Sequence, residues 1–151
     1  MRNKLSGLHY GRVNSKDEFV NFIKSTVPAD DLYIIKPNWF DPRPGSYTDA
    51  ETLDVIFSAL PGKKIIIEGH SHSRNDLSIK ITPENMDEKR EWIRKQEDEY
   101  FQRLGIKEVL DRHNVEYLNI TEEWWKGNTV PSEVIKGIVE SKYSPIGHQE
   151  F

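Results

Sequence analysis

Three short segments with the pattern of β-strands constrain the fold of this chain more than any other feature. They are Leu32–Ile35, Lys63–Glu68 and Val115–Ile120, and the second has three consecutive isoleucines at its centre. The first two are apolar runs bounded by turn residues, which are typical of parallel strands that are covered on both faces. They are therefore predicted to be buried β-strands, and Val115–Ile120 is predicted to be the third strand.

Segments with helical periodicity precede and separate these strands. Capping-box spacing predicts helix starts at Ser15, with Glu18, and at Thr48, with Glu51. Further helices are predicted within 83–104, around 106–110 and at 131–140, the last with Val134, Ile135 and Ile138 on its inward side. The order of these elements predicts an α/β fold with three layers, α/β/α, around a short, mostly parallel sheet.

Length and composition indicate the class of protein. A chain of 151 residues with four Trp, six Tyr and six Phe can bury one ordinary core, so residues 1–151 are predicted to form a single α/β domain. A net charge of -4 without a basic block argues against nucleic acid as a partner. The absence of cysteine and of long apolar segments favours a cytoplasmic protein without a membrane span.

Three loops are expected to form the site. In open parallel sheets, ligands bind beyond the carboxyl ends of the strands, where the strand-to-helix loops gather. Here those loops are residues 36–48, 68–76 and 119–125. Any ligand site is therefore predicted at this edge of the sheet.

The first loop has the chemistry of an anion site. Lys36 supplies a cation, Asn38 a side-chain amide and Thr48 a helix N-terminus, which together suit a carboxylate or a phosphate. The alternative is structural: a solvated Lys36 and a Thr48 that only caps its helix.

The second loop has the chemistry of a metal site. His70 and His72 can direct both imidazoles to one divalent ion, such as zinc, iron or nickel. Asp76, Glu122 or Glu123 would supply a third ligand. The alternative is an exposed polar loop that binds no metal.

The same loop contains the predicted catalytic residues, Glu68 and His70. Glu68 at the end of a strand can serve as a general base. Arg74 is predicted to clamp an anionic ligand through its planar guanidinium group.

The third loop combines acidic and aromatic residues. Glu122 and Glu123 suit the first turn of a helix, and paired-carboxylate catalysis is the alternative. Trp124 and Trp125 are adjacent, so both indoles cannot point into one core. One of them is expected to cover a crevice or an interface.

Several of these segments resemble one protein family. The matching residues are Ile35–Asn38, Thr48, Lys64–Gly69, Phe101 and Leu104–Val109. From about Asp31 to Trp125 the chain resembles the uncharacterised family called domain of unknown function 362, and Lys-Pro-Asn is the most specific element. The resemblance implies an α/β fold with a site near that loop.

The chain also departs from this family. Many members resemble iron-sulfur proteins with cysteine clusters, and no cysteine is present here, so electron transfer is not supported. Members usually continue into a second half, so the chain resembles the N-terminal half of a longer protein. Such a half would leave an apolar edge or face for a partner chain to cover.

Two functions follow from the sequence. The leading hypothesis is a small-molecule-binding α/β domain, enzymatic in its complete form. It holds a small anionic ligand between the first loop and His70 or Arg74, with a divalent metal on the histidines of the second loop. The alternative is a non-catalytic protein-interaction or homo-oligomerisation module. Its aromatic surface would consist of Trp39, Phe40, Trp124 and Trp125.

Overall fold

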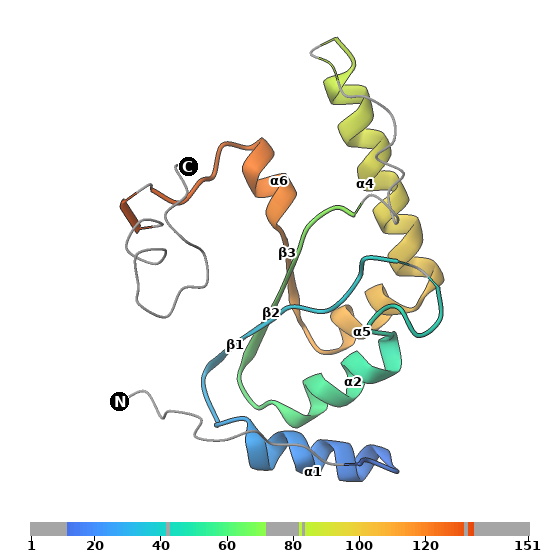
Figure 1. The fold of residues 1–151 in the computed structure, drawn as a ribbon, viewed down its shortest axis with the longest axis vertical. Helices are drawn as coiled ribbons and strands as arrows, with labels where there is room; N and C mark the ends of the chain where they lie inside the picture. Colours follow the sequence, from blue (N-terminus) through green and yellow to red (C-terminus); the bar gives the residue numbers. More distant parts are fainter. Residues whose placement is uncertain (1–11, 42, 72–81, 83, 132, 135–151) are drawn as a thin grey trace.

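The sheet has three parallel strands. The structure is a computed structural model that describes residues 12–41, 43–71, 82, 84–131 and 133–134. Strands β1 (Leu32–Ile35), β2 (Lys63–Glu68) and β3 (Glu116–Asn119) pair side by side in the order β1-β2-β3 (Figure 1). The α/β class and the short parallel sheet are confirmed, although β3 ends at Asn119 because the next helix begins at Ile120.

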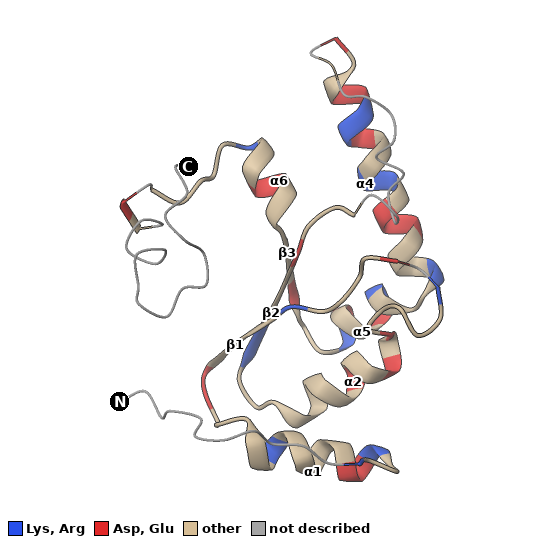
Figure 2. Cartoon of the chain, in the orientation of Figure 1, with Lys and Arg blue, Asp and Glu red and all other residues tan. Residues whose placement is uncertain are grey.

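The described part of the chain has five helices. They are α1 (Lys16–Thr26), α2 (Ala50–Ala59), α4 (Met86–Arg103), α5 (Ile106–Arg112) and α6 (Ile120–Trp125). The Ser15 side chain accepts a hydrogen bond from the Glu18 backbone N–H, as predicted for the start of α1. Acidic and basic residues alternate along α4 (Figure 2), as expected for a helix with one solvated side.

The predicted cap of the second helix is wrong. Asp49, and not Thr48, caps α2 by accepting a hydrogen bond from the Thr52 backbone N–H at 2.8 Å. The Thr48 hydroxyl instead accepts from the Asn38 backbone N–H at 3.0 Å. Thr48 and Asp49 are both residue types that cap helices. Because Thr48 closes the preceding loop, Asp49 caps the helix.

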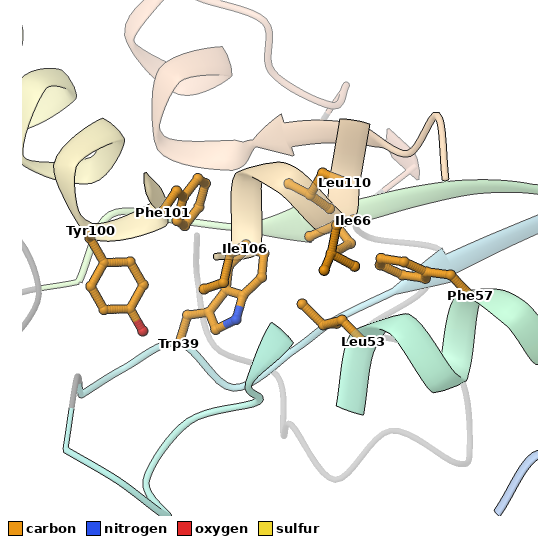
Figure 3. Packing of buried hydrophobic residues seen from close by; sticks show 9 residues of the cluster. Trp39, Leu53, Phe57, Ile66, Tyr100, Phe101, Ile106 and Leu110 are labelled. Carbon is orange, nitrogen blue, oxygen red and sulfur yellow. The ribbon is translucent and has the colours of Figure 1, made fainter. Parts of the chain in front are cut away.

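The helices between the strands lie on one face of the sheet. Right-handed crossovers that add strands in the order β1-β2-β3 place their helices on the same side. On this side Ile66 of β2 packs with the core shown in Figure 3: Trp39, Leu53, Phe57, Tyr100, Phe101, Ile106 and Leu110. Helix α1 packs beside α2 through Ile23, Ala59 and Leu60.

The opposite face of the sheet is uncovered by the described helices. Leu32 and Ile34 of β1 are 46% and 65% exposed, whereas Ile66, one position along in β2, is fully buried. Ile65 and Ile67 of β2 and Leu118 of β3 point to the same side as Ile34. We call Leu32, Ile34, Ile65, Ile67 and Leu118 the open face. The prediction that the strands are buried on both faces is therefore wrong for β1, and no second helical layer occurs among the described residues.

A cluster of charged side chains around Asp54 connects three helices. The Asp54 carboxylate of α2 lies 2.7 Å from Lys16 Nζ, 3.1 Å from Arg112 Nη1 and 2.8 Å from His113 Nε2. Hydrogen bonds from His113 and Lys16 lower the pKa of Asp54 to about 2. The ionised carboxylate thus links α1, α2 and the end of α5.

This cluster makes the stability of the chain depend on pH. The pKa of Asp54 is lower in the folded chain than the unfolded value of about 4, so its contribution is complete above pH ~4 and is lost as the pH falls towards 2. We expect Asp54→Asn to lower the free energy of unfolding by about 1 kcal/mol at pH 7, because solvent screens the pair, and to have little effect near pH 2. Urea denaturation across this range measures the difference. Asp111→Asn, on the exposed side of α5, is the matched control, and a pH-independent difference at Asp54 would contradict the prediction.

Candidate functional site

The carboxyl ends of β2 and β3 bring two predicted loops together. Asn119, the last residue of β3, pairs with Glu68, the last residue of β2. The Asn119 side chain caps α6 by accepting hydrogen bonds from the backbone N–H groups of Thr121 and Glu122, at 3.0 and 3.2 Å. The His70 N–H donates to the Thr121 hydroxyl at 3.1 Å. The turn from β3 into α6 is thus fixed directly beside the end of β2.

Gly69 permits this close approach. A Cβ atom at this position would lie 2.9 Å from Thr121 Oγ1 and 3.3 Å from Ile120 Cγ1. Any larger residue would therefore push the start of α6 away from β2. The glycine after the strand determines how near His70 lies to the third loop.

The imidazole of His70 lies between two carboxylates. Its side chain is only 1% exposed, and its Nε2 lies 3.2 Å from Glu122 Oε1. Its Nδ1 lies 3.3 Å from Glu97 Oε1. A doubly protonated ring would donate to both carboxylates, whereas a neutral ring can donate to only one of them. The arrangement can therefore hold a proton in more than one position.

Glu97, on the buried side of α4, is a site residue that was not predicted from the sequence. Asn119 Nδ2 donates to its Oε2 at 2.9 Å, and the Tyr117 hydroxyl donates to its Oε1 at 3.1 Å. The many charges of this helix predict a solvated side, whereas Glu97 is buried. A signal was present, because Glu97 follows Ile93 by four residues and precedes Tyr100 by three, which places it on the apolar side of the helix.

Glu122 is held as an anion. Arg94 of α4 approaches it with two nitrogens, Nε at 2.9 Å and Nη2 at 2.7 Å. Burial is the largest single influence and would raise the pKa of Glu122, but hydrogen bonds from Arg94 and His70 outweigh it, so the pKa is lowered. The two carboxylates beside His70 thus have different environments.

These residues adjoin a pocket of about 340 Å³ between α4, β3 and α6. Its lining includes Arg94, Glu97, Asp98, Tyr117, Asn119 and Glu122. The ring of Trp125 lies 5.2 Å from the imidazole and 5.0 Å from the Arg90 guanidinium, and so covers the other side of His70. We call His70, Glu97, Asn119 and Glu122 the His70 cluster.

The structure also joins the first loop to the second. Lys36 Nζ lies 3.1 Å from Glu68 Oε2, and the Ser71 hydroxyl donates to the Phe40 carbonyl at 2.6 Å. The Lys36 side chain remains 69% exposed, whereas that of Glu68 is 13% exposed. Glu68, the predicted general base, is therefore ion-paired with Lys36, a residue that was predicted to bind an anion.

Asn38 and Thr48, which were also predicted to bind an anion, instead form hydrogen bonds within their own loop. The Asn38 side chain donates to the Ser46 carbonyl at 3.0 Å, and Thr48 binds the Asn38 backbone as described above. Arg74, predicted as the anion clamp, lies outside the described residues.

The metal site stays a prediction. Within the described residues, no group of three or more histidine and acidic side chains is placed to hold a metal ion. His72 and Asp76 lie outside these residues. Glu122, one of the expected third ligands, does contact His70, through the hydrogen-bonding distance given above.

The four aromatic residues of the predicted interaction surface differ in their burial. Trp124 and Phe40 are 67% and 59% exposed, but Trp39 is fully buried in the core. Trp125 lies over His70. The prediction that Trp124 and Trp125 cannot share a core is confirmed, and the inclusion of Trp39 in an exposed surface is wrong.

Comparison of the chain with protein-family models, with curated proteins and with solved structures gave no match. The resemblance to domain of unknown function 362 therefore stays a prediction. Among the described helices, none has the length and apolar character needed to cross a membrane.

Proposed function

We propose that this chain is a small-molecule-binding α/β domain that exchanges a proton with its ligand through the His70 cluster. One observation carries the proposal: a buried imidazole lies between the carboxylates of Glu97 and Glu122, and both carboxylates line a pocket. Titratable groups in a cleft whose environments differ are typical of acid–base sites.

The two carboxylates support different roles. Glu122 is fixed as an anion by the bidentate Arg94 and orients one nitrogen of the ring. Glu97 receives hydrogen bonds from the neutral donors Asn119 and Tyr117. Proton exchange with a ligand is therefore assigned to Glu97 and His70, and positioning to Glu122 and Arg94.

The class of ligand is a further part of the proposal. Among the described residues that line the pocket, the cations are Arg94 and Lys126, and each is paired with a carboxylate of α6. The pocket itself therefore suits a neutral or cationic polar group, and an anionic ligand beside the exposed Lys36 would have to share this cation with Glu68. A divalent metal on His70 and His72 would place its ligand at the same edge of the sheet.

Thermal unfolding of the chain in the presence of small carboxylates, inorganic phosphate, alkylamines and sugars would test the proposal. A compound that binds the folded chain raises its melting temperature. Calorimetric titration of each such compound in two buffers with different ionisation enthalpies then measures the protons taken up or released. We expect a compound whose binding is proton-linked in the wild type and not in Glu97→Gln.

Glu99→Gln is the matched control, because Glu99 is an exposed residue on the same helix. It should bind like the wild type. Binding without proton exchange would refute acid–base chemistry and leave a simple binding domain. Failure of every compound to bind, or equal loss of binding in both variants, would overturn the site itself.

A further inference from the structure

The charges that line the pocket beside the His70 cluster are unequal. The described lining residues include four carboxylates and two cations: Glu97, Asp98, Glu122, Glu123, Arg94 and Lys126. Four carboxylates against two cations leave a formal charge of -2 on this lining. The carboxylates come from both α4 and α6, and Figure 2 shows acidic stretches on each of these helices. The field inside the pocket therefore favours a positively charged ligand.

Both of these cations are already engaged by carboxylates of the pocket. Arg94 donates to Glu122 from two nitrogens, and Lys126 Nζ lies 2.6 Å from Glu123 Oε1. Asn128 Nδ2 donates to the other oxygen of Glu123 at 2.6 Å, and the hydrogen bonds from Lys126 and Asn128 lower the pKa of Glu123. A bound anion would have to displace one of these carboxylates from its cation, and the displaced carboxylate would remain in the same pocket.

The two carboxylates of α4 lie at different depths along the pocket wall. Glu97 is 7% exposed, whereas Asp98, the next residue, is exposed and forms no ion pair with any described residue. Tyr117 and Leu118 of β3 add apolar surface to the same lining. A bare metal ion would make no use of this apolar surface, whereas the hydrocarbon part of an organic cation would.

We propose that the pocket binds an alkylammonium ion, with the charged nitrogen beside Glu97 and Asp98. The hydrocarbon chain then lies against Tyr117 and Leu118. An ammonium group has three N–H donors and no acceptor, so it matches a wall of carboxylate oxygens, and its attraction to them is stronger in a partly buried pocket than in water. The inference rests on the proposed function, because it specifies the ligand of that site, and it makes Asp98 the residue that selects for positive charge.

Calorimetric titration of three compounds of similar size at neutral pH tests the inference. The compounds are n-butylamine, which is a cation at this pH, 1-butanol, which is neutral, and butyrate, which is an anion. We expect n-butylamine to bind about tenfold more tightly than 1-butanol, and butyrate not to bind measurably. Asp98→Asn should weaken the binding of n-butylamine about threefold and leave that of 1-butanol unchanged, because the carboxylate that it removes is exposed.

Asp87→Asn is the matched control, because it removes the same charge from the exposed first turn of α4, outside the pocket lining. It should leave the affinity for n-butylamine unchanged. Equal weakening by the two substitutions would overturn the inference, and so would equal affinities for n-butylamine and 1-butanol, tighter binding of butyrate, or no binding of any of the three.

Failure of this inference can be distinguished from failure of the proposed function. A sugar, carboxylate or phosphate that binds with proton exchange in the wild type and not in Glu97→Gln would overturn the alkylammonium ligand and leave the proposed function intact. Selective binding of n-butylamine without proton exchange would uphold the ligand class and refute acid–base chemistry at the site.

Discussion

Replacing Trp39 with alanine is expected to lower the free energy of unfolding by about 4 kcal/mol, the usual cost of removing a large aromatic side chain from a core. Trp39 is fully buried, with its ring 4.9 Å from Phe101 and 5.9 Å from Tyr117. Its Nε1–H also donates to the Thr48 carbonyl at 2.9 Å, which attaches the first loop to the core. Since the total stability of a domain is about 5–15 kcal/mol, this variant should be largely unfolded at moderate urea concentrations.

Urea denaturation followed by far-ultraviolet circular dichroism measures this effect. Trp124→Ala is the matched control, because that indole is 67% exposed. We expect it to change the free energy of unfolding by less than about 0.5 kcal/mol. Equal effects of the two substitutions would contradict the placement of Trp39 in the core and restore it to the predicted interaction surface.

The wrong prediction for Trp39 shows which contacts local sequence patterns cannot predict. Apolar runs and capping residues act over a few positions, and they located all three strands and the helices between them. Trp39 stands in a proline-bounded loop, and loops usually run over the surface. It becomes a core residue only because hydrogen bonds between Asn38 and Thr48 fold that loop back onto the helices, and a contact across ten residues has no periodic signal.

Only part of the site could be predicted, because some of its residues are brought together by contacts between distant segments. His70 and Glu122 both follow strands, so the rule for parallel sheets brought them to the same edge, and the structure places them in contact. Glu97 comes from the middle of a helix whose charges suit a solvated surface. Its burial depends on Tyr117 and Asn119, which approach from a strand that is 20 residues away in the sequence. The uncovered side of β1 escaped prediction because a run of apolar residues does not reveal which of its faces the helices cover.

His70→Ala is expected to lower the free energy of unfolding by about 3 kcal/mol, because it removes the group that lies between the buried carboxylate of Glu97 and the partly buried carboxylate of Glu122. Glu122 keeps its bidentate partner Arg94 in this variant. Urea denaturation at neutral pH measures the effect. His113→Ala, which removes a partly exposed histidine from the Asp54 cluster, is the control and should cost about 1 kcal/mol.

A double-mutant cycle separates the lost interaction from the cavity that alanine leaves. Glu97→Gln removes the charge of Glu97 while keeping its size, so it should destabilise the wild type and be nearly neutral in the His70→Ala background. The expected coupling between the two positions is about 1–2 kcal/mol, within the range for residues in one hydrogen-bonded network. Additive effects would mean that His70 contributes only packing beneath Trp125. The buried imidazole would then be a structural feature, and its assignment to proton exchange would lose its physical basis.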